Sequence, residues 1–267
     1  MPTIENALSA LRGALDIAVE DRQIALNPCG AVKAPRRGIA DRAYLTHSQV
    51  HQLADAVRTH PEVVRFLAYT GLRWGEMAAL RVCDFDMLRR RVNITRGVAE
   101  VRGALVWSTP KDHERRAVPF PAMLADELSG LMAGKSRDDL VFTGAEGAVL
   151  RVSTWRPRIM ARAVKDVQSA AAAARAVELR ATGVATTVEF PTVSPHDLRH
   201  TAASLAISAG ANVKAVQRML GHAKASMTLD TYADLFPDDL EAVASALDVA
   251  ARAALESTAD SLRTGQQ

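Results

Sequence analysis

One stretch of the sequence, residues 194–232, restricts the possible folds of this chain more than any other. It begins with Ser194-Pro195-His196-Asp197, where a capping hydroxyl, a proline at the first helical position and an acid at the third are typical of a helix start. A second short helix is predicted over residues 213–220, and Gly221 suits the position that closes it. Tyr232 follows in a further helical turn. The stretch therefore predicts a group of short, connected helices.

Two side chains of this stretch share one helix face. His196 and Arg199 are three residues apart, close to the helix N-terminus. Far upstream, Arg73 is predicted in the first turn of another helix, where backbone N–H groups and the helix dipole favour a phosphate. Glu76, three residues further on, could hold its guanidinium group in place. A lone arginine at a helix start is more often a solvated charge. A phosphate-binding role for Arg73 therefore depends on the other residues of the pattern.

The rest of the sequence predicts a mainly α fold with one small antiparallel β-sheet. Apolar residues recur at helical spacing over residues 4–24, and a basic, proline-containing linker follows. About three antiparallel strands are predicted between residues 91 and 120, with Lys111 at a strand end or turn. Three parts are expected: a helical remnant with its linker (1–40), a large domain (41–236), and a C-terminal helix and tail that two subunits could exchange (237–267).

Composition restricts the class of protein. The sequence has no run of about 18 apolar residues and does not begin with a basic and then apolar leader, so neither a membrane span nor a secretory signal is expected, and the predicted location is cytoplasmic. The two cysteines have no CxxC partner, which argues against a disulfide framework or a zinc site. His47 with His51, and His196 with His200, have HxxxH spacing without the glutamate of HExxH. A metal hydrolase is therefore disfavoured, and no metal or cofactor is expected.

Charge is unevenly distributed along the sequence. Residues 233–267 contain seven acidic and two basic residues, whereas the whole chain has a formal net charge of +3. Residues 1–232 thus form a basic body that precedes an acidic tail. A basic body suits a nucleic-acid partner, although a mild excess of charge alone does not distinguish this from an ordinary solvated surface.

The residue types described above are those that metal-free cleavage of a phosphodiester requires. Two arginines can fork onto the non-bridging oxygens of a phosphate and stabilise the pentavalent transition state, and Arg73 and Arg199 are the candidates. A tyrosine can form a covalent phosphodiester if a neighbouring base accepts its proton, and a lysine can protonate the leaving oxygen. A histidine, with a pKa of about 6.5, suits either proton transfer or a hydrogen bond to the phosphate.

Five sequence elements resemble, in order and approximate spacing, the tyrosine recombinases of the phage integrase family. The elements are Thr70-Gly71-Leu72-Arg73-Trp74-Gly75-Glu76, Thr109-Pro110-Lys111, His196-Asp197-Leu198-Arg199-His200-Thr201, Leu220-Gly221-His222 and Tyr232. HxxR or LGH alone is a weak signal, but chance rarely produces five elements in register. The resemblance covers about residues 41–240, which is nearly all of the expected catalytic domain.

The resemblance implies a mostly helical catalytic domain with a small β-sheet, belonging to a site-specific recombinase or integrase of a mobile element. Such an enzyme cleaves DNA through a 3′-phosphotyrosyl intermediate and rejoins the strand to a different 5′ hydroxyl. The implied partners are double-stranded recombination sites, a homotetramer on DNA formed from monomers in solution, and accessory DNA-bending proteins as further candidates. No membrane partner is expected.

The resemblance also implies a role for each motif residue. These roles are nucleophile for Tyr232, phosphate clamp for Arg73 and Arg199, acid on the leaving oxygen for Lys111, supporting base and hydrogen-bond donor for His196 and His222, and support of Arg73 for Glu76.

The sequence departs from the family pattern in two places. Family members usually carry a core-binding domain of several helices, whereas residues 1–40 offer one predicted helix, so we expect a truncated chain with reduced DNA affinity and site choice. Residues 165–191 also look longer than the usual link to the HxxR helix. Their alanine-rich run, residues 168–180, predicts an extended surface helix.

Three other functions fit part of the pattern. A truncated, catalytically impaired remnant of an integrase, which only binds DNA, would follow from the short N-terminus. A non-catalytic helix-turn-helix protein would account for residues 201–220 but would leave Arg73, Lys111 and Tyr232 unexplained. A type IB topoisomerase shares the chemistry, but an acidic C-terminal helix suited to exchange between subunits favours the recombinase.

Overall fold

The structure of the chain is a computed structural model that describes residues 2–33, 43–109, 115–235, 247–249 and 252. Its contacts divide the chain into two units, Met1–Arg42 and Ala43–Gln267. Nearly all of the helix and tail expected over residues 237–267 lies outside the described residues.

The first unit contains the helix α1 (Pro2–Glu20) and a run of turns. We predicted a helix that continues to Ile24, which is wrong by four residues. The helix ends because Arg22 adopts a left-handed conformation (φ 56°) and the N–H groups that follow bond back to the last turn, as in a Schellman cap. Asn27 ties the turns to the helix, since its Nδ2 donates to Asp16 Oδ1 at 2.6 Å.

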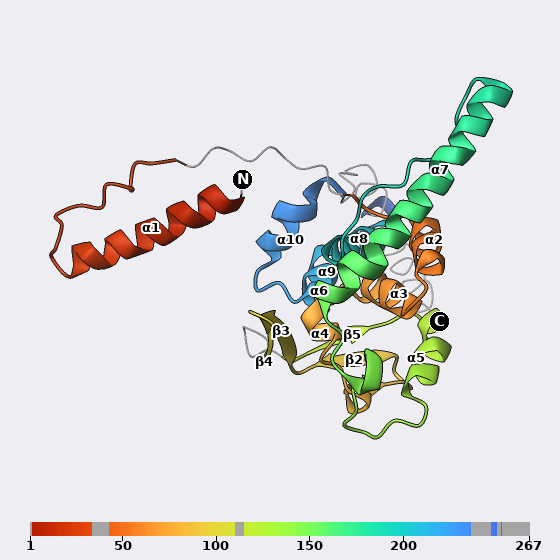
Figure 1. The fold of residues 1–267 in the computed structure, drawn as a ribbon, viewed down its shortest axis with the longest axis horizontal. Helices are drawn as coiled ribbons and strands as arrows, with labels where there is room; N and C mark the ends of the chain where they lie inside the picture. The colour runs from red at the N-terminus through yellow and green to blue at the C-terminus, as the bar shows by residue number, and fades with distance from the viewer. Residues whose placement is uncertain (1, 34–42, 110–114, 236–246, 250–251, 253–267) are drawn as a thin grey trace, which may run out of the picture. The chain divides into compact units, whose positions relative to one another are not determined.

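The second unit is mostly helical (Figure 1). Its α-helices are α2 (His47–Ala56), α3 (Pro61–Thr70), α4 (Trp74–Met77), α5 (Ala125–Met132), α6 (Val152–Trp155), α7 (Ala161–Thr182), α8 (Pro195–Ser208), α9 (Val213–Leu220) and α10 (Ala225–Tyr232). A π-helical turn (Arg156–Met160) joins α6 to α7, and 3₁₀ turns cover Val82–Asp84, Ala122–Leu124, Ala145–Gly147 and Ala233–Leu235. Capping boxes are present at Thr46 and at Ser194, the second of which is the predicted helix start, so local side-chain chemistry starts α2 and α8.

The β structure consists of two small antiparallel sheets, whereas the sequence predicted a single sheet of about three strands. The first has the order β1-β2-β5, and the second is a hairpin of β3 and β4. Their bounds are β1 (Phe85–Asp86), β2 (Arg91–Ile94), β3 (Gly97–Val101), β4 (Ala104–Ser108) and β5 (Arg116–Pro119). Arg102 and Gly103, both with positive φ, form the turn between β3 and β4, and among the described residues these two strands pair only with each other. Strand β2 pairs instead with β5, which follows the hairpin in the sequence.

The core of the second unit surrounds α3, which packs against α8 and α2. Phe66 on α3 contacts Phe142, with ring centroids 4.8 Å apart. The helix ends at Gly71, whose φ of 65° suits glycine. A Cβ at this position would lie 2.8 Å from the Leu220 side chain, so the absence of one lets the end of α3 meet the end of α9. Arg73 lies two residues after this junction.

The predicted extended surface helix is confirmed as α7, whose C-terminal half projects from the rest of the second unit (Figure 1). The returning chain lies along it: Arg175 Nη1 donates to the Thr187 carbonyl at 2.6 Å, and Glu178 accepts hydrogen bonds from Thr187 and Thr186. These bonds lower the pKa of Glu178 to about 2.

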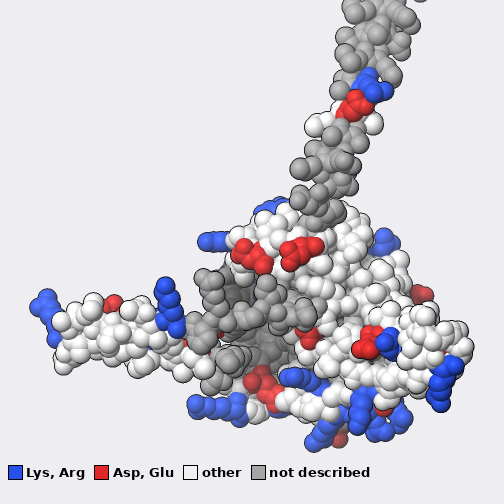
Figure 2. Space-filling view, turned by 90° about the horizontal axis from the view of Figure 1, so that it is seen from above, with Lys and Arg blue, Asp and Glu red and all other residues white. Residues whose placement is uncertain are grey.

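In Figure 2, lysine and arginine side chains gather along the lower margin of the second unit, which is called the basic margin of the body below. No helix among the described residues combines the length and the apolar character needed to cross a membrane. The mainly α fold with small antiparallel sheets agrees with the prediction.

Candidate active site

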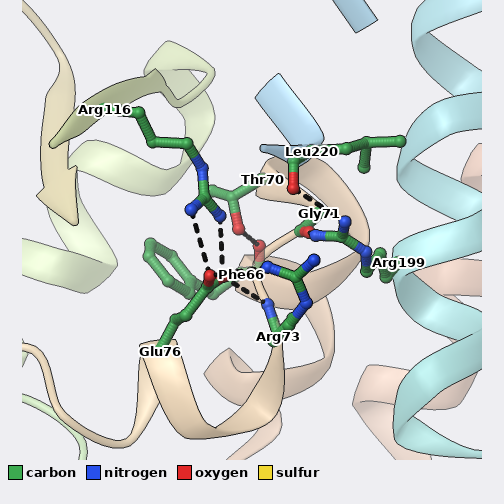
Figure 3. A network of polar contacts seen from close by, with 8 residues as sticks. All are labelled: Phe66, Thr70, Gly71, Arg73, Glu76, Arg116, Arg199 and Leu220. Carbon is green, nitrogen blue, oxygen red and sulfur yellow. Dashed lines mark hydrogen bonds and ion pairs between the residues drawn. The ribbon is translucent and has the colours of Figure 1, made fainter. Parts of the chain in front are cut away.

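Arg199 on α8 holds the ends of two other helices together. The residue is 3% exposed, and its Nη1 and Nη2 donate to the carbonyls of Gly71 at 2.6 Å and Leu220 at 2.7 Å (Figure 3). These carbonyls lie at the ends of α3 and α9, where unpaired C=O groups form the negative end of the helix dipole. Burial and the nearby charge of Arg73 lower the pKa of Arg199 to about 10. The guanidinium group therefore remains charged at neutral pH.

Arg73 stands at the N-terminus of α4, one position before the first turn in which it was predicted. Its backbone N–H donates to Glu76 Oε2 at 2.8 Å, and its Nη1 donates to Oε1 at 3.0 Å. The side chain of Arg73 is 49% exposed, whereas that of Glu76 is 8% exposed. Glu76 thus holds Arg73 as the sequence suggested, and leaves much of the guanidinium group open to a ligand.

Arg116 on β5 is a further arginine of this network, which the sequence analysis missed. Its Nη1 and Nη2 donate to the two oxygens of Glu76 at 3.0 and 2.7 Å, in the bidentate geometry that favours arginine (Figure 3). Burial alone would raise the pKa of Glu76, but the hydrogen bonds and charges of Arg116 and Arg73 outweigh it and lower that pKa. The buried carboxylate is therefore ionised and joins two arginines.

Gly221, the glycine of the LGH element, gives Arg116 the space it occupies. A Cβ at Gly221 would lie 2.7 Å from Cζ of Arg116, and the glycine also has a φ of 65°. One sequence signal could have identified Arg116: it is two positions before the buried Val118 on the same strand, so the two side chains share the inward face.

The two predicted histidines of the site are weak bases. His222 follows α9, its Nδ1 lies 2.9 Å from Thr228 Oγ1, and burial together with the charges of Arg199 and Arg73 lowers its pKa to about 4. His196, in the first turn of α8, also has a lowered pKa, because burial and the charge of Arg199 outweigh the effect of Asp197. His222 is therefore neutral at pH 7 and suited to hydrogen bonding, and the shift of His196 acts in the same direction.

Tyr232, the last residue of α10, is 2% exposed. Its ring packs with an apolar cluster formed by Ala203, Ile207, Val216 and Leu220. Its hydroxyl lies 2.8 Å from Nδ1 of His200, a histidine to which the sequence analysis gave no catalytic role. Tyr232 is close enough to Arg199 for its charge to raise the pKa of that arginine. The structure thus brings the tyrosine, a histidine and the buried arginine together.

Two hollows adjoin these residues. One, of about 160 Å³, is lined by Arg73, His196 and Arg199, together with Arg156 of the π-helical turn. The other, of about 590 Å³, is lined by residues that include Arg73, Glu76, Arg116, Gly221, His222, Ser108 and Thr109. Lys111, predicted as the general acid, lies outside the described residues, which stop at Thr109 on this side.

Of the seven predicted site residues, six lie in the described part of the chain. Burial, hydrogen bonds and charge effects connect Arg73, Glu76, His196, Arg199, His222 and Tyr232 in one region. Within the described ranges, no three His, Cys, Asp or Glu side chains are grouped so that they could hold a metal ion. The arrangement offers cations on the surface of a hollow and a tyrosine beside them, which suits the binding and attack of a phosphate.

Comparison with known proteins agrees with the fold and the motifs. The profile of the phage integrase family matches residues 43–238. The chain therefore belongs to the phage integrase family. Among curated relatives, it is 28% identical over 229 residues to the integrase of Mycobacterium phage L5, covering 84% of this chain and 57% of that protein. It is 27% identical over 237 residues to the tyrosine recombinase XerC of Mycobacterium leprae, covering 85% and 70%.

Solved structures share the fold at lower identity. The integrase of the Tn1549 transposon, in complex with transposon right end DNA, aligns with a TM-score of 0.73 and 20% identity over 94% of this chain and 80% of that one. A lambda integrase dimer bound to a COC′ core site aligns with a TM-score of 0.52 and 17% identity, over 82% and 71%. The chain spans little more than half the length of the phage L5 integrase, so the activity of the whole protein is a separate question.

Proposed function

We propose that this protein is a site-specific DNA recombinase that cuts and rejoins strands through a 3′-phosphotyrosyl intermediate. The observation that carries the proposal is that Arg73 and Arg199 line one hollow, while Tyr232, on a third helix, is close enough to Arg199 for its charge to raise the pKa of that arginine. Membership of the phage integrase family supports the same reaction. The proposed substrate is double-stranded DNA, because relatives of the same fold were solved in complex with DNA.

In the proposed reaction, Arg73 and Arg199 bind the non-bridging oxygens of the scissile phosphate. The half-exposed side chain of Arg73 can reach a ligand without leaving Glu76. Positive charge placed in advance lowers the barrier because it meets the charge that develops in the pentavalent state. His222 and His196, which are weak bases, donate hydrogen bonds to the same phosphate group.

The bond changes are a displacement at phosphorus. The Tyr232 oxygen gives its proton to a neighbouring base and forms a bond to phosphorus while the bond from phosphorus to the 5′ oxygen breaks, and Lys111 gives a proton to that 5′ oxygen. A 5′ hydroxyl of another strand then reverses these steps and releases the tyrosine. Because the arginines supply the positive charge, we expect cleavage to proceed in EDTA.

The domains and the assembly belong to the same proposal. Residues 41–236 are proposed as the catalytic domain, residues 1–40 as part of a DNA-binding unit, and residues 237–267 as a segment exchanged between subunits. We expect monomers in solution and a homotetramer on two recombination sites, with DNA-bending proteins as candidate accessories. The basic margin of the body provides a surface for backbone phosphates (Figure 2).

The test uses the full chain in EDTA with nicked duplexes, taken from the flanks of its own gene and from a random-sequence library. Nicking lets the cleaved fragment diffuse away, so a covalent product accumulates. We expect an SDS-resistant protein–DNA adduct with the wild type and none with Tyr232→Phe. DNA binding without an adduct would instead indicate a protein that binds recombination sites and does not cleave them, in which case the proposed activity is wrong.

A further inference from the structure

The hydrogen bond between Tyr232 and His200 joins two residues that are 32 positions apart in the sequence. The hydroxyl oxygen and Nδ1 are 2.8 Å apart, and the ring centroids are 5.7 Å apart with a 58° tilt. At neutral pH a phenol is protonated, since its ordinary pKa is about 10. A phenol that attacks phosphorus must therefore lose a proton, and the group beside its oxygen in this structure is an imidazole.

The surroundings of His200 contain several other titratable groups. On its own helix, the ring of His196 meets it edge-on at 4.9 Å and 90°, and Arg199 is its neighbour in sequence. From outside that helix, His222 is near enough for the charge of His200 to lower the pKa of His222. Tyr44 packs against the same apolar cluster as Tyr232. The ring of His200 thus contacts both the ring of His196 and the buried phenol of Tyr232.

We propose that His200 is the base that takes the phenolic proton of Tyr232 during strand cleavage, an inference that rests on the proposed function. As the bond from the tyrosine oxygen to phosphorus forms, the O–H bond breaks and its proton moves to Nδ1 of His200. The bond from phosphorus to the 5′ oxygen breaks in the same step, with protonation by Lys111. In rejoining, the imidazolium returns the proton to the tyrosine oxygen as that oxygen leaves.

Two observations favour His200 over the other histidines near the arginines. Nδ1 of His222 is already engaged with Thr228, and burial next to Arg199 makes His222 and His196 weak bases. Full transfer from a phenol to an imidazole, with ordinary pKa values of about 10 and 6.5, is uphill. The proton therefore moves while the new phosphorus–oxygen bond draws charge away from the phenol, and Arg199 lies close enough to stabilise that charge.

The same chain contains a matched control. His47 Nδ1 lies 3.0 Å from the hydroxyl of Tyr69, and the two rings stack with centroids 5.6 Å apart. This pair has the same chemical groups as His200 with Tyr232. Burial alone raises the pKa of Tyr69, with no arginine among the causes, whereas the charge of Tyr232 acts on Arg199. Loss of a histidine–tyrosine hydrogen bond can therefore be measured separately from loss of a base at the reacting oxygen.

The experiment compares His200→Asn with His47→Asn in the full chain. Asparagine keeps a hydrogen-bonding group near the position of Nδ1 but cannot accept a proton at these pH values. We expect His200→Asn to melt near the wild-type temperature and to form the covalent adduct about 10² to 10⁴ times more slowly at pH 7. Its rate should rise with pH up to about pH 9 as phenolate forms, whereas the wild-type rate levels off. His47→Asn should follow the wild type.

A second substrate separates His200 from the general acid. When the 5′ oxygen is replaced by sulfur, the leaving group needs no proton, so Lys111→Ala should regain its rate on this substrate and His200→Asn should not. If His200→Asn were destabilised, His200→Gln would take its place in the same assays.

Three results would overturn the inference. One is a His200→Asn rate and pH profile like those of the wild type, which would make His200 a structural partner only and leave the proposed function standing. Another is rescue of His200→Asn by the sulfur substrate, which would place its role at the leaving group. The absence of any adduct with wild-type protein would overturn the proposed function together with this inference.

Discussion

Two tyrosines of the second unit are hydrogen-bonded to histidines, and only their surroundings distinguish them. Tyr69 stacks on His47, and burial raises its pKa with no cation among the causes. Tyr232 bonds to His200 beside Arg199, whose pKa reflects burial first and then the charges of nearby groups, which include Arg73, Glu76 and Tyr232 itself. A histidine next to a phenol is therefore not enough to identify a nucleophile. The neighbouring arginines, which can bind the phosphate to be attacked, make the difference.

The largest expected effect comes from removing the hydroxyl of Tyr232, and removal of the Tyr69 hydroxyl is its control. Tyr232→Phe should abolish the covalent adduct, because no other atom can take the place of its oxygen. Tyr69→Phe should keep adduct formation within about a factor of three and cost about 1 kcal/mol of stability through its lost hydrogen bond. Gel analysis after SDS denaturation and urea unfolding measure these effects. An adduct with Tyr232→Phe would mean that the two tyrosines have been assigned wrongly.

Arg199→Lys should have the next largest effect. A lysine cannot donate to Gly71 and Leu220 and also fork onto a phosphate, so we expect cleavage to slow by about 10²- to 10³-fold. Single-turnover cleavage rates measure the loss. The control is Arg65→Lys, because Arg65 also donates through two of its nitrogens, to the carboxylate of Glu127, and lines neither hollow of the site. Equal rates for the two variants would contradict a role of Arg199 in the chemistry.

Arg116→Met should leave Glu76 buried with Arg73 as its remaining arginine partner. Breaking a buried ion pair costs about 3 kcal/mol or more, and a displaced Arg73 should slow cleavage by roughly 10- to 100-fold. The lowered pKa of Glu76 contributes stability above the ordinary carboxyl pKa, and this is lost as pH falls through the lowered value. Burial would raise the pKa of Glu76 in the variant, so the stability difference should narrow as pH falls. Urea unfolding at pH 7 and pH 4 tests this, and a constant difference would contradict it.

Gly221→Ala should disturb the same network through a single methyl group. The substitution lowers the free energy of unfolding for two reasons. An alanine at position 221 must adopt a left-handed backbone conformation, which costs about 1 kcal/mol, and its methyl group meets the Arg116 guanidinium group. Gly210→Ala is the matched control, since Gly210 also has a positive φ, 86°, but a Cβ there meets no atom within 4 Å. We expect both variants to lose stability and Gly221→Ala alone to lose cleavage rate. Similar cleavage rates for both would show that Arg116 moves aside without consequence.

The smallest expected effect concerns His222. Its pKa in the folded protein is about 4, below the ordinary value of about 6.5, so between these values the unfolded chain binds a proton that the folded chain does not. Stability should therefore fall as pH decreases through this window. His222→Gln should flatten that part of the profile, measured by urea unfolding between pH 4 and pH 7. An unchanged slope would assign the loss to other groups.

Local chemistry made much of the fold predictable, and long-range contacts explain the rest. The capping boxes at Thr46 and Ser194 and the glycine at 221 act within a few residues, so the sequence was enough to locate the ends of these helices. Arg116 meets Glu76 across 40 residues, and His200 meets Tyr232 across 32. Periodicity indicates the face on which such a side chain lies but not its partner. The split into two sheets was missed for a similar reason, because which strands pair depends on the turn between β3 and β4.

The hydrogen bonds of Arg199 have an evolutionary consequence. The same guanidinium group that is proposed to bind phosphate also closes the junction between α3 and α9, so selection for folding alone should preserve it. Arg73 is half exposed and makes no comparable link between helices in the described contacts. When members of this family lose their activity, Arg73 should drift first and Arg199 last. The identity of the residue at position 73 is therefore the more informative marker of a working enzyme.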